Sequence, residues 1–140
     1  MDKNKIKTSK FLVTGGAGFL GSNMCDLLLA NGAKVICIDD LSNGKMVNIA
    51  HLKKNRKFKF YKKDVNEFSQ IKPLFEKEKP DYVIHYAAMV GVKRTSDNPL
   101  EVFKDIEGIK NIAELSRSHK IKKILFTSSS EVYGEPVKLP

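Results

Sequence analysis

The stretch that decides the fold of this chain is Phe11-Leu12-Val13-Thr14-Gly15-Gly16-Ala17-Gly18-Phe19-Leu20-Gly21. An apolar run ends here in a glycine-rich turn and leads into an amphipathic segment, which predicts a strand, a loop and a helix. Gly15 permits a tight turn, Gly18 lets backbone N–H groups approach an anion, and Gly21 lets the helix pack close to the strand. The helix N-terminus then favours a pyrophosphate through its unpaired N–H groups and its dipole.

An acidic pair strengthens this interpretation of the glycines. A second apolar run over residues 34–38 ends in Asp39 and Asp40, and Asp39 lies 18 residues after Gly21. A carboxylate at that distance, where the next strand ends, accepts hydrogen bonds from the ribose hydroxyls of a dinucleotide. The alternative is a plain glycine turn followed by a solvated aspartate pair. The strand and helix flanks favour the dinucleotide.

The rest of the chain alternates between strand and helix patterns. We expect strands at about residues 10–14, 34–38, 57–61, 82–88 and 123–127. We expect helices at about 19–30, 45–54 (weak), 68–78 and 99–119, with Leu20, Met24, Leu27 and Leu28 on the inner face of the first. Such alternation predicts an α/β fold with a doubly wound parallel sheet of strand order 3-2-1-4-5, whose ligands gather where the strands end.

Length and composition indicate one domain at residues 9–140, preceded by a frayed basic arm at residues 1–8. The 140 residues are 41% hydrophobic and 29% charged, as in ordinary globular proteins. No run of 18 apolar residues and no signal-peptide core occurs, so we expect no membrane partner and a cytoplasmic location. Cys25 and Cys37 have neither metal-ligand nor redox spacing and are interpreted as buried hydrophobic residues, with no metal site.

The net charge of +9 raises the question of a nucleic-acid partner. The densest basic cluster, over residues 53–63, interleaves lysines with Phe58, Phe60 and Tyr61. However, Lys57-Phe58-Lys59-Phe60 alternates with a period of two, as does a strand with one buried face, and lysines protect an outer strand from aggregation. We therefore expect no nucleic-acid binding.

Five segments together resemble a known family. They are Thr14–Gly21, Asp39-Asp40-Leu41-Ser42-Asn43, Asp64-Val65, His85-Tyr86-Ala87-Ala88 and Ser128-Ser129-Ser130-Glu131-Val132-Tyr133-Gly134. In this order they resemble the extended short-chain dehydrogenase/reductases with a Rossmann-type fold, specifically the NAD-dependent nucleotide-sugar epimerases and dehydratases. The resemblance implies NAD as cofactor, bound by Gly15, Gly18, Phe19, Leu20, Gly21, Asp39, Asp40, Asn43, Asp64, Val65, Tyr86, Ala87 and Ala88.

The resemblance also implies catalytic roles. Ser129 matches the serine that bonds the sugar hydroxyl being oxidised, and Glu131 matches an acid or base of the dehydratases and decarboxylases. In that family the base is the tyrosine of a Tyr-x-x-x-Lys helix, a motif that does not occur in these 140 residues. We therefore expect a truncated fold without its substrate domain, and a chain that is inactive alone. His85 is interpreted as a satisfied, partly buried histidine.

Several functions remain open at this point. The leading one is the NAD-binding part of a nucleotide-sugar epimerase that works through a transient 4-keto sugar. The alternatives are a 4,6-dehydratase, a UDP-glucuronate decarboxylase and a non-catalytic NAD-binding module. The substrate would be a UDP-, dTDP-, GDP- or CDP-linked sugar, and the resemblance leaves a homodimer open, through the helix from Pro99 and the helix after the fifth strand.

Overall fold

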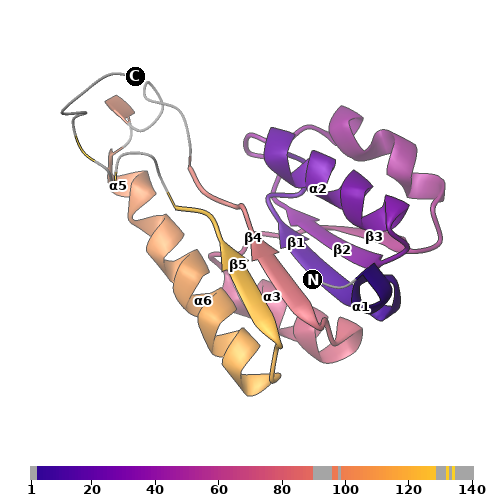
Figure 1. The fold of residues 1–140 in the computed structure, drawn as a ribbon. Coiled ribbons are helices and arrows are strands. Elements are labelled where there is room, and N and C mark those ends of the chain that lie inside the picture. Colours follow the sequence, from indigo (N-terminus) through magenta and orange to yellow (C-terminus); the bar gives the residue numbers. More distant parts are fainter. Residues whose placement is uncertain (1–2, 90–95, 98, 129–131, 133, 135–140) are drawn as a thin grey trace.

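Five parallel strands form the sheet, and β1 (Lys10–Thr14) lies at its centre (Figure 1). The computed structural model describes residues 3–89, 96–97, 99–128, 132 and 134. The strand order is β3-β2-β1-β4-β5 and every neighbouring pair is parallel, so the predicted order is confirmed. The remaining strands are β2 (Lys34–Asp39), β3 (Phe58–Lys62), β4 (Tyr82–His85) and β5 (Lys123–Phe126).

Helices cover both faces of the sheet (Figure 1). One face carries α2 (Phe19–Ala30) and the 3-10 helix η1 (Met46–Lys54). The other face carries α3 (Phe68–Glu78) and α6 (Lys104–Ser118). This is the doubly wound arrangement, in which both faces of a parallel sheet are buried.

Two apolar clusters fill the space between the layers. Phe11 and Val13 of β1 belong to the cluster that includes Leu28 of α2. Leu12 lies between them in sequence and belongs to the other cluster, with Phe75 of α3. Successive side chains of a strand point to opposite faces, so a strand buried on both sides needs apolar residues throughout. This explains the continuous apolar runs of β1 and β2.

The inner face of α2 differs from the expected one. Leu20 and Leu27 are 59% and 57% exposed, whereas Leu28 is buried as expected and Met24 packs partly buried against the core. The buried residues of the helix also include Gly21, Ser22 and Cys25. The expectation for Leu20 and Leu27 was therefore wrong by one position around the helix. The cause is steric, because Gly21 has to face the preceding turn and the small Cys25 follows it one turn later.

Residues 3–8 form a helix rather than a frayed arm. Helix α1 (Lys3–Thr8) precedes β1, and Ile6 packs against the apolar cluster under α2. The Ser9 hydroxyl donates a hydrogen bond to the Lys5 carbonyl at 2.5 Å and closes the helix. The expectation of a frayed arm overlooked Ile6, the apolar side chain of α1.

Other element boundaries differ by a few residues. β4 ends at His85 instead of residue 88, because the chain leaves the sheet there. The expected helix over residues 99–119 is divided into α5 (Pro99–Val102) and α6, with Phe103 as the N-cap residue of α6. The weak helix at 45–54 is a 3-10 helix. Cys25 and Cys37 are buried free thiols, as expected.

A buried carboxylate at the end of α3 ties that helix to the sheet. Glu78 is 2% exposed, and its carboxylate accepts hydrogen bonds from Lys59 Nζ at 3.0 Å and from the Tyr61 hydroxyl at 2.7 Å. Lys10 Nζ lies 4.0 Å from the Oε2 atom of Glu78. Burial alone would raise the pKa of Glu78, but the Tyr61 hydroxyl and the two lysines outweigh it and lower the pKa. Burial and the same hydrogen bond raise the pKa of Tyr61 to about 12.

Replacing Glu78 should make the free energy of unfolding depend less on pH in the acid range. The folded pKa of Glu78 is lowered, so its ionised form stabilises the fold at neutral pH, and this contribution is lost as the pH falls below about 4.3, the ordinary glutamate value, through the folded pKa. Glu78→Gln should lower the free energy of unfolding at pH 7 by about 1–3 kcal/mol. In urea denaturation, the difference from the unmodified protein should shrink in acid.

The matched control is Glu76→Gln on the same helix. Glu76 is exposed and makes only a 3.8 Å surface pair with Lys72, which contributes about 0–1 kcal/mol. An equal loss for both variants, or a Glu78→Gln deficit that persists unchanged at low pH, would contradict the assigned role of Glu78.

Candidate functional site

The predicted binding residues gather where β1, β2, β3 and β4 end. The register pairs Thr14 with both Ile38 and His85, so the loops that follow β1, β2 and β4 start side by side. Asp39 in turn pairs with Lys62, which brings the segment after β3 to the same edge. Parallel strands place all their carboxyl ends on one edge of a sheet, and this edge carries the candidate site.

The glycine loop makes two approaches that only glycine allows. Gly15 has φ = +64°, and a Cβ there would lie 2.7 Å from the backbone nitrogen of Ala87. At Gly21 a Cβ would collide with the Gly15 carbonyl oxygen and lie 2.6 Å from the Gly16 Cα. The loop therefore packs between α2 and the segment after β4, with Gly18 as the N-cap residue of α2.

Asp39 holds two loops through its carboxylate. Oδ2 accepts a hydrogen bond from the Ala17 N–H at 2.9 Å, and Oδ1 accepts one from the Leu41 N–H at 2.8 Å. The residue is only 6% exposed. Each oxygen keeps a lone pair beyond these bonds, which is the chemical requirement for accepting a ribose hydroxyl. The sequence did not reveal that this acid also organises the site.

The loop after β2 folds back over the glycine loop. The Ala17 carbonyl accepts hydrogen bonds from the Asn48 side-chain amide at 2.7 Å and from the Lys45 N–H at 3.0 Å. Asp40 is exposed and accepts a hydrogen bond from the Ser42 N–H at 2.9 Å, and Asn43 is exposed beside them. The polar rim of the site therefore comes from residues 40–43, while its base is the buried Asp39.

The segment after β3 is held by α6. The Asp64 carboxylate accepts a hydrogen bond from the Asn66 N–H at 2.8 Å, and Val65 is buried. The Asn111 side-chain amide donates to the Val65 carbonyl at 3.0 Å and to the Asn66 carbonyl at 2.9 Å. Gly108 leaves room there, because a Cβ would lie 2.6 Å from Asn66 Oδ1.

The segment after β4 contacts the end of β1 directly. The Tyr86 N–H donates to the Thr14 carbonyl at 3.2 Å, and the Ala87 N–H donates to the Thr14 hydroxyl at 3.2 Å. Burial raises the pKa of Tyr86, because its ring packs partly against the cluster under α2. The Met89 N–H donates to Asp105 of α6 at 2.6 Å.

All the predicted binding residues lie at this edge, some of them exposed and others buried. Phe19 and Leu20, at the start of α2, and Ala88 are exposed. Ser129 and Glu131 lie outside the described residues. Sequence reasoning missed a set of residues that position the loops, namely Thr14, Asn48, Asp105 and Asn111. The one available signal was a polar side chain on an apolar helix face, as Asn111 beside Ile112.

These residues fit a dinucleotide chemically. The first backbone N–H groups of α2 have no intrahelical acceptor, and the loop before them carries no side chain that would block a pyrophosphate. Asp39 supplies acceptors for hydroxyl groups next to that loop. Within the described part of the chain, no group of three histidine, cysteine, aspartate or glutamate residues is arranged to hold a metal ion. None of the described helices is long and apolar enough to span a membrane.

Comparison with known proteins gives consistent matches. The family model described as GDP-mannose 4,6 dehydratase matches residues 12–140. The UDP-glucose 4-epimerase of Mycolicibacterium smegmatis is 38% identical over 131 residues, which cover 92% of this chain and 42% of that protein. The UDP-glucuronate 4-epimerase of Thermodesulfobacterium geofontis is 36% identical over 130 residues, covering 89% of this chain and 40% of that protein.

Solved structures agree with these matches. The UDP-Glc/GlcNAc 4-epimerase from Campylobacter jejuni superposes with a TM-score of 0.85 at 34% identity, over 93% of this chain and 40% of that one. The UDP-glucose 4-epimerase from Thermus thermophilus in complex with NAD gives a TM-score of 0.77 at 32% identity, over 86% and 37%. The chain thus spans about 40% of the length of these relatives.

A methyl group at Gly21 should disrupt the site from within. Alanine is favoured over glycine inside a helix by about 1 kcal/mol, whereas overpacking costs about 1–3 kcal/mol. We expect the collision with Gly15 to dominate, so that Gly21→Ala lowers the free energy of unfolding in urea. Gly18→Ala is the control, because its Cβ would lie 3.2 Å from the Gly15 oxygen and needs only a small shift. A Gly21→Ala protein as stable as the unmodified one would contradict the close approach.

Proposed function

Because the chain belongs to the NAD-dependent nucleotide-sugar epimerase/dehydratase family, we propose that it is the NAD-binding part of a nucleotide-sugar 4-epimerase. The observation that carries the proposal is the glycine loop packed against the buried Asp39 at the carboxyl edge of the sheet. The NAD complex of a structural relative supports the choice of cofactor. The curated relatives named as 4-epimerases support the reaction.

In this proposal the chain binds and orients the cofactor. The N-terminus of α2 and the loop from Gly15 to Gly21 hold the pyrophosphate, and Asp39 accepts the ribose hydroxyls. Asp64 and Val65 flank the adenine, while Tyr86, Ala87 and Ala88 line the path beyond the pyrophosphate. When bound, NAD supplies the reversible hydride acceptance that epimerisation through a transient 4-keto sugar requires.

The catalytic assignments remain proposals as well. Ser129 would orient the sugar hydroxyl and Glu131 would serve as an acid or base. The Glu131 role applies to the dehydratases and decarboxylases. The base that removes the hydroxyl proton in an epimerase is the tyrosine of a Tyr-x-x-x-Lys motif, which does not occur in the 140 residues. We therefore propose that turnover needs residues beyond those of this chain, which spans about 40% of the length of its relatives.

The substrate is proposed from the relatives. Their names carry UDP-linked sugars, which favours a UDP-sugar over dTDP-, GDP- or CDP-linked ones. The description of the matching family model keeps a 4,6-dehydratase as the second candidate. We also propose a homodimer, supported by the exposed Phe103, Ile106 and Ile109 along α6, and a cytoplasmic location.

The carboxylate of Asp39 should select NAD over NADP. A buried negative charge beside the ribose repels a 2′-phosphate. Asp39→Ala should weaken NAD binding by about 1–3 kcal/mol, because it removes a charged acceptor and releases the Ala17 and Leu41 amides. Isothermal titration with NAD and NADP measures both effects.

Glu76→Ala is the control for this experiment. Glu76 is an exposed acid on α3 that pairs only with Lys72 at the surface, so its removal should change NAD affinity little. Equal affinity of the unmodified chain for NAD and NADP, or equal losses for the two variants, would contradict the role of Asp39.

Turnover should require more chain than these 140 residues. We expect NAD binding at best weak and no conversion of UDP-glucose, UDP-glucuronate or dTDP-glucose, because a positioned base contributes about 10²–10⁴-fold in rate and substrate orientation several kcal/mol. A version extended through the downstream reading frame should convert one of these sugars with NAD. The assay follows NADH-like absorbance and the sugar product. Turnover by the 140 residues alone would show that the base lies within them.

A further inference from the structure

A buried pair of polar side chains joins β1 and β4 beneath the candidate site. Thr14 is the last residue of β1 and His85 the last of β4, and the register places them opposite each other. The Thr14 hydroxyl oxygen lies 2.7 Å from His85 Nδ1, and the same oxygen accepts the Ala87 N–H at 3.2 Å. Thr14 is fully buried and His85 is 2% exposed.

The hydrogen bonds of the Thr14 hydroxyl indicate which ring nitrogen of His85 carries the proton. The Thr14 oxygen already accepts from the Ala87 N–H, so its own proton needs an acceptor. Nδ1 of His85 provides one only if the ring proton is on Nε2. With the proton on Nδ1 instead, the buried hydroxyl would receive two donors and have no acceptor among its contacts in the described residues. An unpaired buried donor costs about 1–3 kcal/mol, which favours the Nε2–H form.

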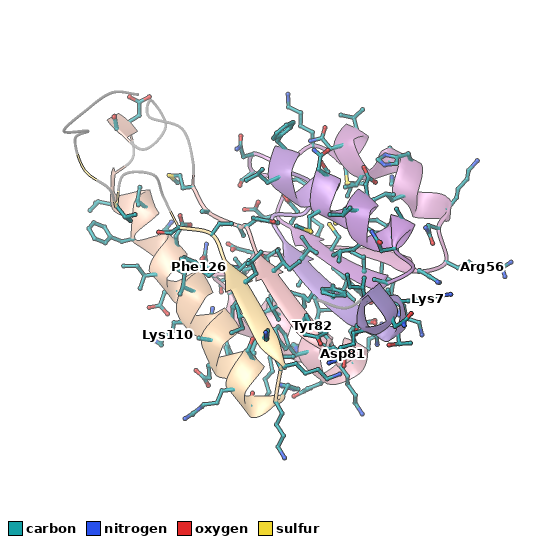
Figure 2. All side chains as sticks on the ribbon, viewed as in Figure 1. Lys7, Arg56, Asp81, Tyr82, Lys110 and Phe126 are labelled. Atoms are coloured by element: carbon teal, nitrogen blue, oxygen red, sulfur yellow. The ribbon has the colours of Figure 1, made fainter. Side chains whose placement is uncertain are left out.

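The surroundings of His85 keep the ring neutral and fixed. Burial lowers the pKa of His85 to about 4, so the imidazole is uncharged at neutral pH. Its ring stacks on Phe126 of β5 with centroids 5.7 Å apart, and Phe126 is labelled in Figure 2. The Thr127 hydroxyl donates to the His85 carbonyl at 3.3 Å.

The contact reaches the glycine loop through the Ala87 peptide. A Cβ on Gly15 would lie only 2.7 Å from the Ala87 nitrogen, so this peptide packs directly against the turn. The Thr14 hydroxyl holds that nitrogen, and the Tyr86 N–H bonds the Thr14 carbonyl at 3.2 Å. Any shift of the Ala87 peptide would therefore move or loosen the turn at Gly15.

We propose that His85 is a positioning residue for the cofactor loop: its Nδ1 accepts the Thr14 hydroxyl proton, which turns the hydroxyl oxygen toward the Ala87 N–H and sets the turn at Gly15. This inference rests on the proposed function, because the loop's role in NAD binding is itself a proposal. His85 takes no part in proton transfer. It acts only through Thr14.

Two substitutions at His85 separate positioning from packing. His85→Phe keeps an aromatic ring against Phe126 and removes the acceptor, whereas His85→Asn keeps an acceptor oxygen near the Nδ1 position and loses volume. If His85 acts through Thr14, His85→Phe should raise the NAD dissociation constant on the order of tenfold, the effect of one hydrogen bond, and His85→Asn should change it less. A packing role predicts the reverse order, and that order would overturn the proposal.

Variants of Thr14 test whether a hydroxyl at this position preserves NAD affinity and whether its effect is coupled to that of His85. Thr14→Ser keeps the hydroxyl and should bind NAD nearly as the unmodified protein does, while Thr14→Val should resemble His85→Phe. Adding His85→Phe to Thr14→Val should cause no further loss, because the two residues act as one unit. Fully additive losses in the double variant would show that His85 does not act through Thr14.

Measurements without cofactor test the contact between His85 and Thr14 separately from NAD binding. Nitrogen-15 NMR of the imidazole rings should show an unprotonated Nδ1 and a protonated Nε2 for His85, identified by its loss in His85→Asn. Hydrogen exchange at the Ala87 amide should accelerate on the order of tenfold in His85→Phe and in Thr14→Val. A protonated Nδ1, or unchanged exchange in both variants, would overturn it. If neither this chain nor the version extended through the downstream reading frame binds NAD, the proposed function fails and these readouts decide alone.

Discussion

The two hydrogen bonds to the Asp39 carboxylate are the interaction on which the candidate site depends. A carboxylate that is nearly buried needs donors, and the nearest ones are the backbone N–H groups of Ala17 and Leu41. These amides belong to the loops after β1 and β2, so one side chain determines how the two loops lie relative to each other. The Ala17 carbonyl completes the junction by accepting from Asn48.

Close packing at two glycines adds a second contact to the same loop. The absence of a side chain at Gly15 and Gly21 lets the same loop pack against the segment after β4 on one side and against α2 on the other. The segments that follow β1, β2 and β4 therefore come together at the site. Around Gly15 their backbones lie closer together than side chains would permit. Hydrogen bonds among the site's own groups hold this surface together in the absence of a ligand.

At the other end of the strands, where β1, β4 and β5 start, charged side chains stabilise the fold. Asp81, at the start of β4 (Figure 2), accepts the Lys10 N–H at 2.9 Å and pairs with Lys122 Nζ at 2.6 Å. Together with Glu78 and its lysines, this carboxylate ties the starts of β1, β4 and β5 to one another and to α3. Part of the net positive charge thus has a structural function, because Lys10, Lys59 and Lys122 pair with these carboxylates.

The sequence by itself determined the order of the elements, the parallel sheet and the place of the site, because apolar periodicity and turn residues are local signals that follow the chain. It also indicated the acid at Asp39 from its spacing to the glycines. Only the tertiary structure decided which groups meet: that Asp39 bonds Ala17, that Asn111 holds the segment after Val65, and that Thr14 faces His85 across 71 residues of chain. The rotation of α2 away from Leu20 and Leu27 has the same origin. Such contacts depend on strand register and on steric collisions between distant backbones, and neither is written in the pattern of any single segment.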